Sequence, residues 1–380
     1  MIIFSGYKYS KPCIVKYDSQ NKRLFVDDQE VALSDYQANS SDSAKKKFIR
    51  LILGTKCNLQ CSYCSQLKTD IEYSISDCDS FIIPENTGHI EFWGGEPLIY
   101  RKYIDRLMPK LKEQGIKASL ITNGYLLDAD TIEWLNKNSI AITISHDGPS
   151  SSRESCRLSL DLLSNLNDWM VSRVISPGDS VFSLYSYFEK LDLLHKLRVH
   201  PKIFNITQYT ATQKDELITA SEIFTIAATN QLAGIRWDVH TAMNALFQGH
   251  ESCSLNEDHV YVMDIKNNLF ACQNYVRKQD VLSKKAYIPI NSLCDSCIIR
   301  NICGGGCKIV NDYYYYYASC RSYFTYYSAI FSAAIFFLTG VILDKCESIT
   351  LPYWNINKIE LREQKQYQMP YLIESALQAA

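Results

Sequence analysis

The chain has 380 residues, of which 47% are hydrophobic, and its formal net charge is −2. This length and apolar content allow a large buried core and more than one domain. The nearly balanced charge provides no attraction to a phosphate backbone, so nucleic-acid binding is not expected. Residues 1–6 lack the charged region and cleavage site of a secretory signal, which predicts a protein that is not exported.

Short strands are predicted in residues 1–46. Segments 13–17 and 23–26 alternate in polarity, and the polar residues 19–21 between them favour a turn. This region is shorter than a complete winged-helix domain for leader-peptide recognition. Its strands either present an edge to an extended peptide or cap the open bottom of the domain that follows.

From residue 47 onward, strand-like and helix-like segments alternate, which is the pattern of parallel βαβ units. The predicted strands are residues 49–53, 89–93, 118–122, 141–145, 170–175 and 202–207. The predicted helices include residues 98–114, 131–138, 154–166 and 220–230. Parallel barrels carry their sites at the carboxyl ends of the strands, so motifs that follow these strands are expected to converge.

Three cysteines follow the first of these strands, at the C-x3-C-x2-C spacing of Cys57, Cys61 and Cys64. A [4Fe–4S] cluster takes one thiolate on each iron, so three thiolates leave one iron free for another ligand. The alternative is a set of buried or zinc-binding cysteines. A Gly-Gly-Glu-Pro sequence at residues 94–97, after the second strand, makes that alternative the weaker one. Its glycines allow the backbone to approach a ligand closely.

Together, the two motifs resemble those of the radical S-adenosylmethionine (SAM) enzymes. In that family the open iron chelates SAM, and an electron from the cluster splits SAM into methionine and a 5′-deoxyadenosyl radical. This radical then takes a hydrogen atom from an unactivated carbon. The resemblance implies an α/β fold in which residues 47–245 form a partial (β/α)6 TIM-like barrel. It makes the three cysteines the catalytic cluster ligands.

The same resemblance implies which residues contact SAM. Main-chain groups at the two glycines would hold its ammonium, with a carboxylate nearby, and a serine after the fourth strand would contact its ribose. An arginine in the following Ser-rich stretch either pairs with the SAM carboxylate or is a solvated side chain. A Thr-Asn-Gly sequence at residues 122–124 is expected to form a turn at the rim. The candidate SAM contacts are Tyr63, Gly94, Gly95, Glu96, Ser145 and Arg153.

A second group of cysteines resembles the SPASM domain of radical SAM proteins, which places this domain at residues 246–345 and leaves residues 346–380 as a C-terminal tail. Family pairing would give one auxiliary [4Fe–4S] cluster to Cys294, Cys297, Cys303 and Cys320. A second auxiliary cluster, nearer the barrel, would be held by Cys253, Cys272 and Cys307. The glycine of the family pattern is replaced by Asn267, which also tolerates a left-handed turn.

The nearer auxiliary cluster lacks a fourth thiolate. Sulfatase-maturing relatives supply a cysteine at the position of His259, and imidazole can replace thiolate on a cluster iron. The histidine is therefore a candidate ligand. The alternatives are a site open to solvent or substrate, with the histidine merely a polar residue at the start of a strand.

The remaining cysteines bear on the compartment. Ten of the 14 cysteines are assigned to clusters, and the other four are scattered without a common spacing, so no disulfide framework is expected. Air-sensitive clusters and unpaired thiols indicate a reducing cytoplasm. Residues 323–343 carry no charge and are long enough to span a bilayer. A helix buried against the barrel is the preferred interpretation, and no membrane partner is expected.

SPASM proteins mostly act on peptides and proteins, and auxiliary clusters suit oxidation because a substrate radical must lose one more electron. The resemblance therefore implies a peptide maturase that oxidatively crosslinks side chains of a ribosomal precursor, with a cyclophane-type link as the specific expectation. The implied partners are that precursor peptide and a reductant protein such as flavodoxin or ferredoxin.

Two other reaction classes remain as alternatives. Anaerobic sulfatase maturases carry an aspartate directly after the second SPASM cysteine, as the base, and that position is Gln273 here. An amide does not accept that proton. The second alternative is a radical SAM enzyme that acts on a small molecule or a modified nucleotide. A non-catalytic iron-sulfur protein is disfavoured by the intact Gly-Gly-Glu-Pro sequence.

Overall fold

The computed structural model describes residues 1–31, 46–61, 71–146, 160–175, 180–201, 220–226, 242–243, 245–247, 257–273, 276, 281–284, 294, 297–304 and 316–347. Of the predicted site residues, Tyr63, Cys64, Arg153, Cys253 and Cys307 lie outside these ranges. The backbone of Cys320 is helical, and its side chain is not described.

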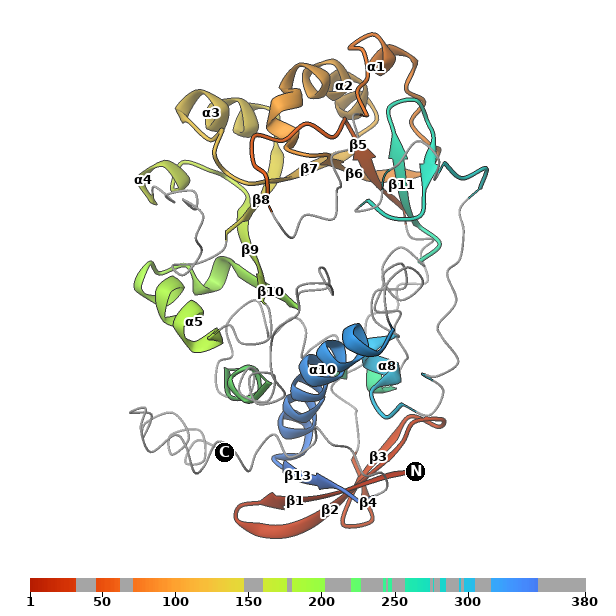
Figure 1. Ribbon diagram of the computed structural model, residues 1–380, viewed down its shortest axis with the longest axis vertical. Helices are drawn as coiled ribbons and strands as arrows, with labels where there is room; N and C mark the ends of the chain where they lie inside the picture. The colour runs from red at the N-terminus through yellow and green to blue at the C-terminus, as the bar shows by residue number, and fades with distance from the viewer. Residues whose placement is uncertain are drawn as a thin grey trace.

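The main sheet has eight strands in the order β10-β9-β8-β7-β6-β5-β11-β12. Strands β5 to β10 run parallel, each beside the next in the chain, as βαβ units require. The strands are β5 (Lys47–Ile52), β6 (Thr87–Trp93), β7 (Lys117–Thr122), β8 (Ile140–Ser145), β9 (Trp169–Ile175), β10 (Leu197–Pro201), β11 (Val260–Asp264) and β12 (Leu269–Phe270). The predicted α/β fold is confirmed, and Figure 1 shows the sheet curving from β5 to β10.

Helices lie between the strands and cover the outer face of the sheet. They are α1 (Asp77–Ser80), η1 (Pro97–Tyr100), α2 (Arg101–Glu113), α3 (Ala129–Lys137), α4 (Leu160–Leu163), α5 (Val181–Lys190) and η2 (Leu194–Lys196). Helix α2 buries one apolar stripe at a helical spacing, made by Ile104, Leu107, Met108 and Leu111. Helix α3 begins where the Asp128 carboxylate accepts a hydrogen bond from the backbone N–H of Thr131, at 2.8 Å.

The two faces of the central strands differ in character. Ile49 and Leu51 of β5 and Ile90 and Phe92 of β6 are fully buried in the main hydrophobic core. The residues between them, which point to the other face because side chains alternate along a strand, are half-buried and include charged groups. This polar inner face is where the barrel's contents would lie.

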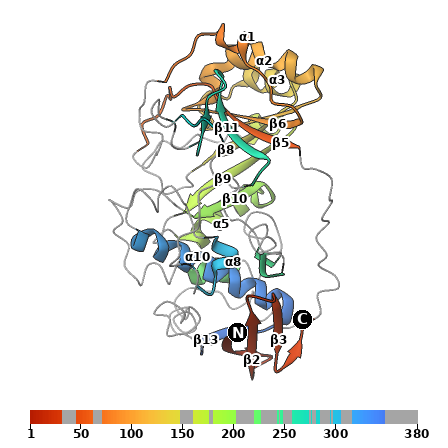
Figure 2. The ribbon, with the colours of Figure 1, turned by 90° about the vertical axis from the view of Figure 1, so that its right-hand side faces the viewer.

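A second sheet has the order β13-β1-β2-β3-β4. Its strands are β1 (Ile2–Lys8), β2 (Lys11–Asp18), β3 (Arg23–Val26), β4 (Gln29–Glu30) and β13 (Ile342–Cys346). Phe4 and Tyr17 of this sheet pack on Phe331 of α10 (Tyr316–Thr339), with ring centroids 5.4 and 6.2 Å apart. Figures 1 and 2 place the sheet at the opposite end of the molecule from β5 and β6.

The uncharged segment 323–343 is divided between two elements, because α10 ends at Thr339 and β13 begins at Ile342. Its helical part is buried, as predicted, with Ala329, Ile330 and Phe331 fully covered. Within the described residues, no helix combines the length and apolar character needed to cross a membrane.

Two elements of the structure, β10 and α5, were not among the predicted ones. The sixth strand was expected at residues 202–207, which lie outside the described residues, and β10 precedes them. Helix α5 was not predicted, because its aromatic and β-branched residues have low helix propensity. It forms because Ser180 caps it through the N–H of Ser183 and because Val181, Leu184, Tyr185 and Phe188 bury one face.

Candidate functional site

The first two cysteines of the triplet lie just beyond the carboxyl end of β5. The Cys57 side chain is exposed, and Cys61 is half-buried. The backbone N–H of Leu59 lies 3.4 Å from the Cys57 Sγ, and the side-chain amide of Asn123 lies 3.8 Å from the same sulfur. Although part of the Cys57 side chain is exposed, the removal of water from around its sulfur raises the pKa of the thiol. These amide donors suit a sulfur that carries negative charge, as a cluster thiolate does.

The base of the cysteine-bearing segment is closed by paired contacts. Thr55 and Ile71 exchange two hydrogen bonds of 3.1 Å, from the Thr55 N–H to the Ile71 carbonyl and from the Ile71 N–H to the Thr55 hydroxyl. Lys56 forms an ion pair with Glu72, at 3.2 Å. These contacts join the two ends of the segment and so offset the entropy cost of closing it.

Tyr100 forms hydrogen bonds with both ends of the cysteine-bearing segment. Its hydroxyl accepts a hydrogen bond from the Lys56 N–H, at 2.7 Å, and donates one to the Glu72 carboxylate, at 3.0 Å. Gly54 has a φ of +148°, and a Cβ placed there would lie 2.4 Å from the Tyr100 hydroxyl oxygen. Only glycine is compatible with both the backbone angle and this contact.

The Gly-Gly-Glu-Pro sequence packs directly on the same base. The N–H of Glu96 donates to the Lys56 carbonyl, at 2.8 Å. A Cβ on Gly94 would lie 2.6 Å from the Gly54 carbonyl oxygen, and one on Gly95 would lie 2.1 Å from the Lys56 carbonyl oxygen. The structure therefore shows a second requirement for glycine here, the close approach of the backbone that carries the cysteines. The contact of these glycines with SAM stays a prediction.

We expect Gly95→Ala to lower the free energy of unfolding by about 3 kcal/mol, because the new methyl group has backbone on its near side and no flexible group to displace. The iron bound per chain should fall with it. Gly115→Ala is the matched control, since nothing lies within 4 Å of a Cβ there and only its φ of +65° opposes the change. That control should cost about 1–2 kcal/mol. Urea unfolding midpoints and iron analysis test both variants, and equal losses would contradict the packing argument.

Glu96 joins the ends of β6 and β7. Its side chain is 1% exposed. Its carboxylate accepts hydrogen bonds from the Thr122 hydroxyl at 2.8 Å, from the Asn123 N–H at 2.8 Å and from the Leu98 N–H at 3.1 Å. Burial raises the pKa of Glu96. The sequence placed this carboxylate beside the SAM ammonium, and the structure shows that three donors of the chain itself occupy it.

The turn at residues 122–124 contacts the segment that carries the cysteines. Asn123 donates from its side-chain amide to Asn58 Oδ1, at 2.7 Å, and so reaches the cysteine segment from β7. Its own Oδ1 accepts from the Tyr125 N–H, at 3.1 Å. The sequence predicted a turn at the rim of the site, but it did not predict that the Asn123 side chain contacts the cysteine segment.

Ser145 lies at the carboxyl end of β8 and is exposed, at the same edge as the cysteine segment and the two glycines. The next residue, His146, is 2% exposed and stacks on Tyr187, with ring centroids 5.8 Å apart. The histidine is therefore a core residue, while the serine remains available at the site edge.

The strands that form this edge lie in a region that matches a known protein family. Residues 51–207 match the family described as the Radical SAM superfamily. Residues 51–207 form a radical SAM domain. The radical SAM cyclopropyl synthase TigE of Paramaledivibacter caminithermalis is 21% identical over 328 residues, covering 69% of this chain and 67% of that protein. The cysteine-type anaerobic sulfatase-maturating enzyme of Clostridium perfringens is 23% identical over 347 residues, covering 71% and 93%.

A solved structure shares the fold of this chain. Native anSMEcpe with bound AdoMet and Cp18Cys peptide matches with a TM-score of 0.62 and 18% identity, covering 77% of this chain and 99% of that one. The predicted radical SAM assignment is confirmed, and with it the cofactors of the class, a [4Fe–4S] cluster and SAM. The residues present fit them: thiol groups beside amide donors, at the carboxyl edge of a parallel sheet.

The inner face of the radical SAM sheet carries a polar bridge. Arg50 of β5 pairs with Glu91 of β6, with 3.2 Å between Nε and Oε2. Its Nη1 also donates to the Gln273 side-chain oxygen, at 3.1 Å. The guanidinium lies 5.9 Å from the Trp93 ring centroid. Cys272, which is buried, is thereby held next to the barrel interior.

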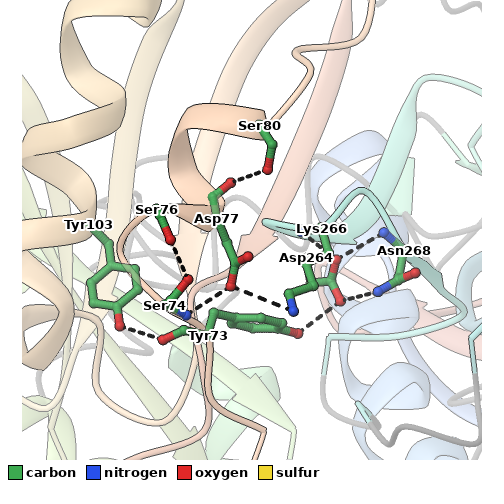
Figure 3. Close-up of polar contacts among 9 residues, drawn as sticks. All are labelled: Tyr73, Ser74, Ser76, Asp77, Ser80, Tyr103, Asp264, Lys266 and Asn268. Atoms are coloured by element: carbon green, nitrogen blue, oxygen red, sulfur yellow. Dashed lines mark hydrogen bonds and ion pairs between the residues drawn. The ribbon is translucent and has the colours of Figure 1, made fainter.

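The hairpin β11–β12 leads to Cys272 and is fastened to the segment that follows the cysteines. Asp264 is 2% exposed and accepts hydrogen bonds from the N–H groups of Lys266 and Asn268, both at 2.9 Å. It also accepts one from the Tyr73 hydroxyl, at 2.8 Å (Figure 3). Asn267 has a φ of +65°, which confirms the left-handed turn expected there.

Three of the predicted auxiliary ligands lie on one short stretch. The N–H of Cys297 donates to the Cys294 carbonyl, at 3.0 Å, and Cys303 ends helix α8 (Arg300–Cys303). Within the described residues, no group of three or more His, Cys, Asp or Glu side chains is placed to hold a metal ion. The two auxiliary clusters therefore stay predictions. Of their other predicted ligands, Cys272 is described, Cys253 and Cys307 lie outside the described ranges, and the side chain of Cys320 is not described.

His259 stands at the start of β11. Its Nε2 lies 3.3 Å from the Glu257 carboxylate, and its carbonyl accepts a hydrogen bond from the Phe48 N–H, at 2.8 Å. Its proposed partner Cys253 lies outside the described residues. Ligation by this histidine stays a prediction.

Proposed function

We propose that this radical SAM enzyme is a peptide maturase that oxidatively crosslinks side chains of a ribosomal precursor. The spacing of seven cysteines in residues 253–320 supports the SPASM assignment and two auxiliary clusters. The curated relatives include a cyclopropyl synthase and a sulfatase-maturating enzyme, and the solved relative is described with a bound peptide. These likenesses support a peptide as the substrate class.

One observation carries the choice of reaction. The residue after Cys272 is Gln273, and its amide oxygen accepts a hydrogen bond from the Arg50 guanidinium, at 3.1 Å. Formylglycine formation requires a base that deprotonates a substrate thiol or hydroxyl, and an amide is not such a base. The position that carries the base in sulfatase maturases is therefore unsuited to that chemistry here.

Some residues at the site would hold the cluster, and others position the segment that carries the cysteines. Cys57, Cys61 and Cys64 would hold the cluster, whose bound form supplies the electron that cleaves SAM. Glu96 and Asn123 keep the ends of β6 and β7 against the cysteine segment, so that the thiols and the strand ends stay together. A reductant protein such as flavodoxin or ferredoxin would deliver the electron.

A sulfatase-maturase activity is the second candidate, favoured by the 93% coverage of the Clostridium perfringens enzyme and by the shared fold. The two candidates differ in product. Crosslinking removes two hydrogens and leaves no carbonyl group, whereas sulfatase maturation leaves an aldehyde.

The test uses reconstituted enzyme with SAM, a reductant and the peptide encoded beside the gene. We expect a product two hydrogens lighter, detected by mass spectrometry, that does not react with hydrazide. A sulfatase-derived cysteine peptide should give 5′-deoxyadenosine slowly and no aldehyde. Capture of an aldehyde by hydrazide would instead assign the sulfatase-maturase reaction.

A further inference from the structure

Glu91 occupies an unusual place for a carboxylate. It lies on β6 between two fully buried core residues, Ile90 and Phe92, and it points to the opposite, inner face of the sheet. Trp93, on the same inner face, directly precedes the Gly-Gly-Glu-Pro sequence. At about 3.3 Å per residue, Glu91 lies about 7 Å before the end of the strand at Trp93. The carboxylate therefore sits beneath the SAM edge, inside the barrel.

Few groups compete for this carboxylate. Its side chain is 15% exposed, and among the described residues Arg50 is its hydrogen-bond partner, through Oε2. Across the sheet, the register places Ser119 of β7 beside it, and the Ser119 hydroxyl contacts His89, at 2.7 Å. Burial raises the pKa of Glu91 and lowers that of His89. Lys117, opposite His89, is exposed at the start of β7.

The bridge through Arg50 connects Glu91 to the position where the sulfatase maturases carry their base. Arg50 contacts Glu91 on one side and Gln273 on the other, at 3.2 and 3.1 Å. Gln273 itself does not accept a proton, and His89 is stacked on Phe48 with ring centroids 4.7 Å apart, further from the SAM edge. Glu91 is the carboxylate that the inner face provides next to this position.

We propose that Glu91 is the proton acceptor of the crosslinking reaction, with Arg50 as the residue that positions it. This inference rests on the proposed function. The deoxyadenosyl radical takes one hydrogen atom from a substrate Cβ, and the carbon radical bonds to a ring carbon. The ring then loses one electron to a predicted auxiliary [4Fe–4S] cluster and one proton to the Glu91 carboxylate. The product is two hydrogens lighter, and the ring is aromatic again.

The experiment compares wild type, Glu91→Gln and Arg50→Gln as reconstituted enzymes, with the peptide encoded beside the gene. In Glu91→Gln, product formation should fall about 100-fold, the usual contribution of a general base. Deoxyadenosine should then accumulate in excess over product. Arg50→Gln breaks the same ion pair by removing the cation, and it retains the Glu91 carboxylate as the base. A merely structural pair would make the two variants behave alike.

The pH dependence separates the roles further. Wild-type product formation should fall as the pH is lowered through the raised pKa of Glu91, because the base must be deprotonated. In Arg50→Gln this decline should move to higher pH, since loss of the cation raises the pKa further. Infrared difference spectra of wild type against Glu91→Gln report the carboxyl titration directly. Its midpoint should match the decline in product formation, and a mismatch would overturn the assignment.

A rescue variant completes the test. Gln273→Asp in the Glu91→Gln background places a carboxylate on the other side of Arg50. Product formation in this double variant should be about tenfold faster than in Glu91→Gln alone. A crosslink formed by Glu91→Gln at the wild-type rate would overturn the role of Glu91 alone. An aldehyde from the wild-type enzyme would overturn the crosslinking function and this role with it.

Discussion

Replacement of Cys57, Cys61 and Cys64 together by alanine should abolish SAM cleavage and remove one cluster. Three clusters correspond to about twelve iron atoms, so about four should be lost while the auxiliary clusters remain. The reason is that these thiols are the predicted ligands of the SAM-binding cluster, whereas the other predicted ligands lie more than a hundred residues further along the chain. Iron and sulfide analysis, with chromatography of 5′-deoxyadenosine, measures both effects.

The control for this variant is Cys13→Ala. Cys13 is buried in β2 of the N-terminal sheet and belongs to neither cysteine motif. Its replacement should leave the iron content and SAM cleavage unchanged. Deoxyadenosine formation that persists in the triple variant would show that the cluster assignment is wrong.

Glu96→Ala should lower the free energy of unfolding by about 3 kcal/mol and sharply reduce iron retention at the SAM site. The substitution leaves the Asn123 N–H and the Thr122 hydroxyl without their buried acceptor. It also releases Asn123, which contacts Asn58 in the cysteine segment. Urea unfolding and iron analysis measure the two effects. The control is Glu91→Ala, since Glu91 lies five residues earlier, on β6, and makes none of these bonds. This variant should retain the cluster.

The pH dependence of this effect has a definite sign. Burial raises the pKa of Glu96 above its usual range near 4.3, so the folded state binds this proton more tightly than the unfolded chain. The stability contributed by this group is therefore present at low pH and declines as the pH rises through the raised value. Glu96→Gln, which does not titrate, should lack this decline. The same slope in both proteins would contradict the assignment.

Much of the fold could be predicted from the sequence, for local reasons. Five of the six predicted barrel strands coincide with β5 to β9, because each is a short apolar run bounded by turn residues. The sixth, residues 202–207, lies outside the described residues. Helix α5 was missed because aromatic residues conceal the helical period. The pairing of β11 with β5 joins residues about two hundred positions apart, and no local pattern indicates such a contact.

The radical SAM site shows the same division. The spacing of Cys57, Cys61 and Cys64 indicated them as ligands only together with the Gly-Gly-Glu-Pro sequence, since closely spaced thiols on one loop suit both a cluster and a zinc ion. The packing of the glycines was not indicated by the sequence, since a close backbone neighbour such as the Lys56 carbonyl is invisible in a linear motif.

The sequence by itself indicated radical SAM chemistry, because the cysteine motif and the alternation of strands and helices involve residues that are close together in the chain. Only the tertiary structure decided what surrounds that chemistry. Asn123 reaches Asn58 from the end of another strand. Arg50 joins Glu91 to Gln273, which lies 223 positions after Arg50 in the chain. Such contacts depend on the register of parallel strands and on which face each side chain occupies, and these are set when distant segments pack together.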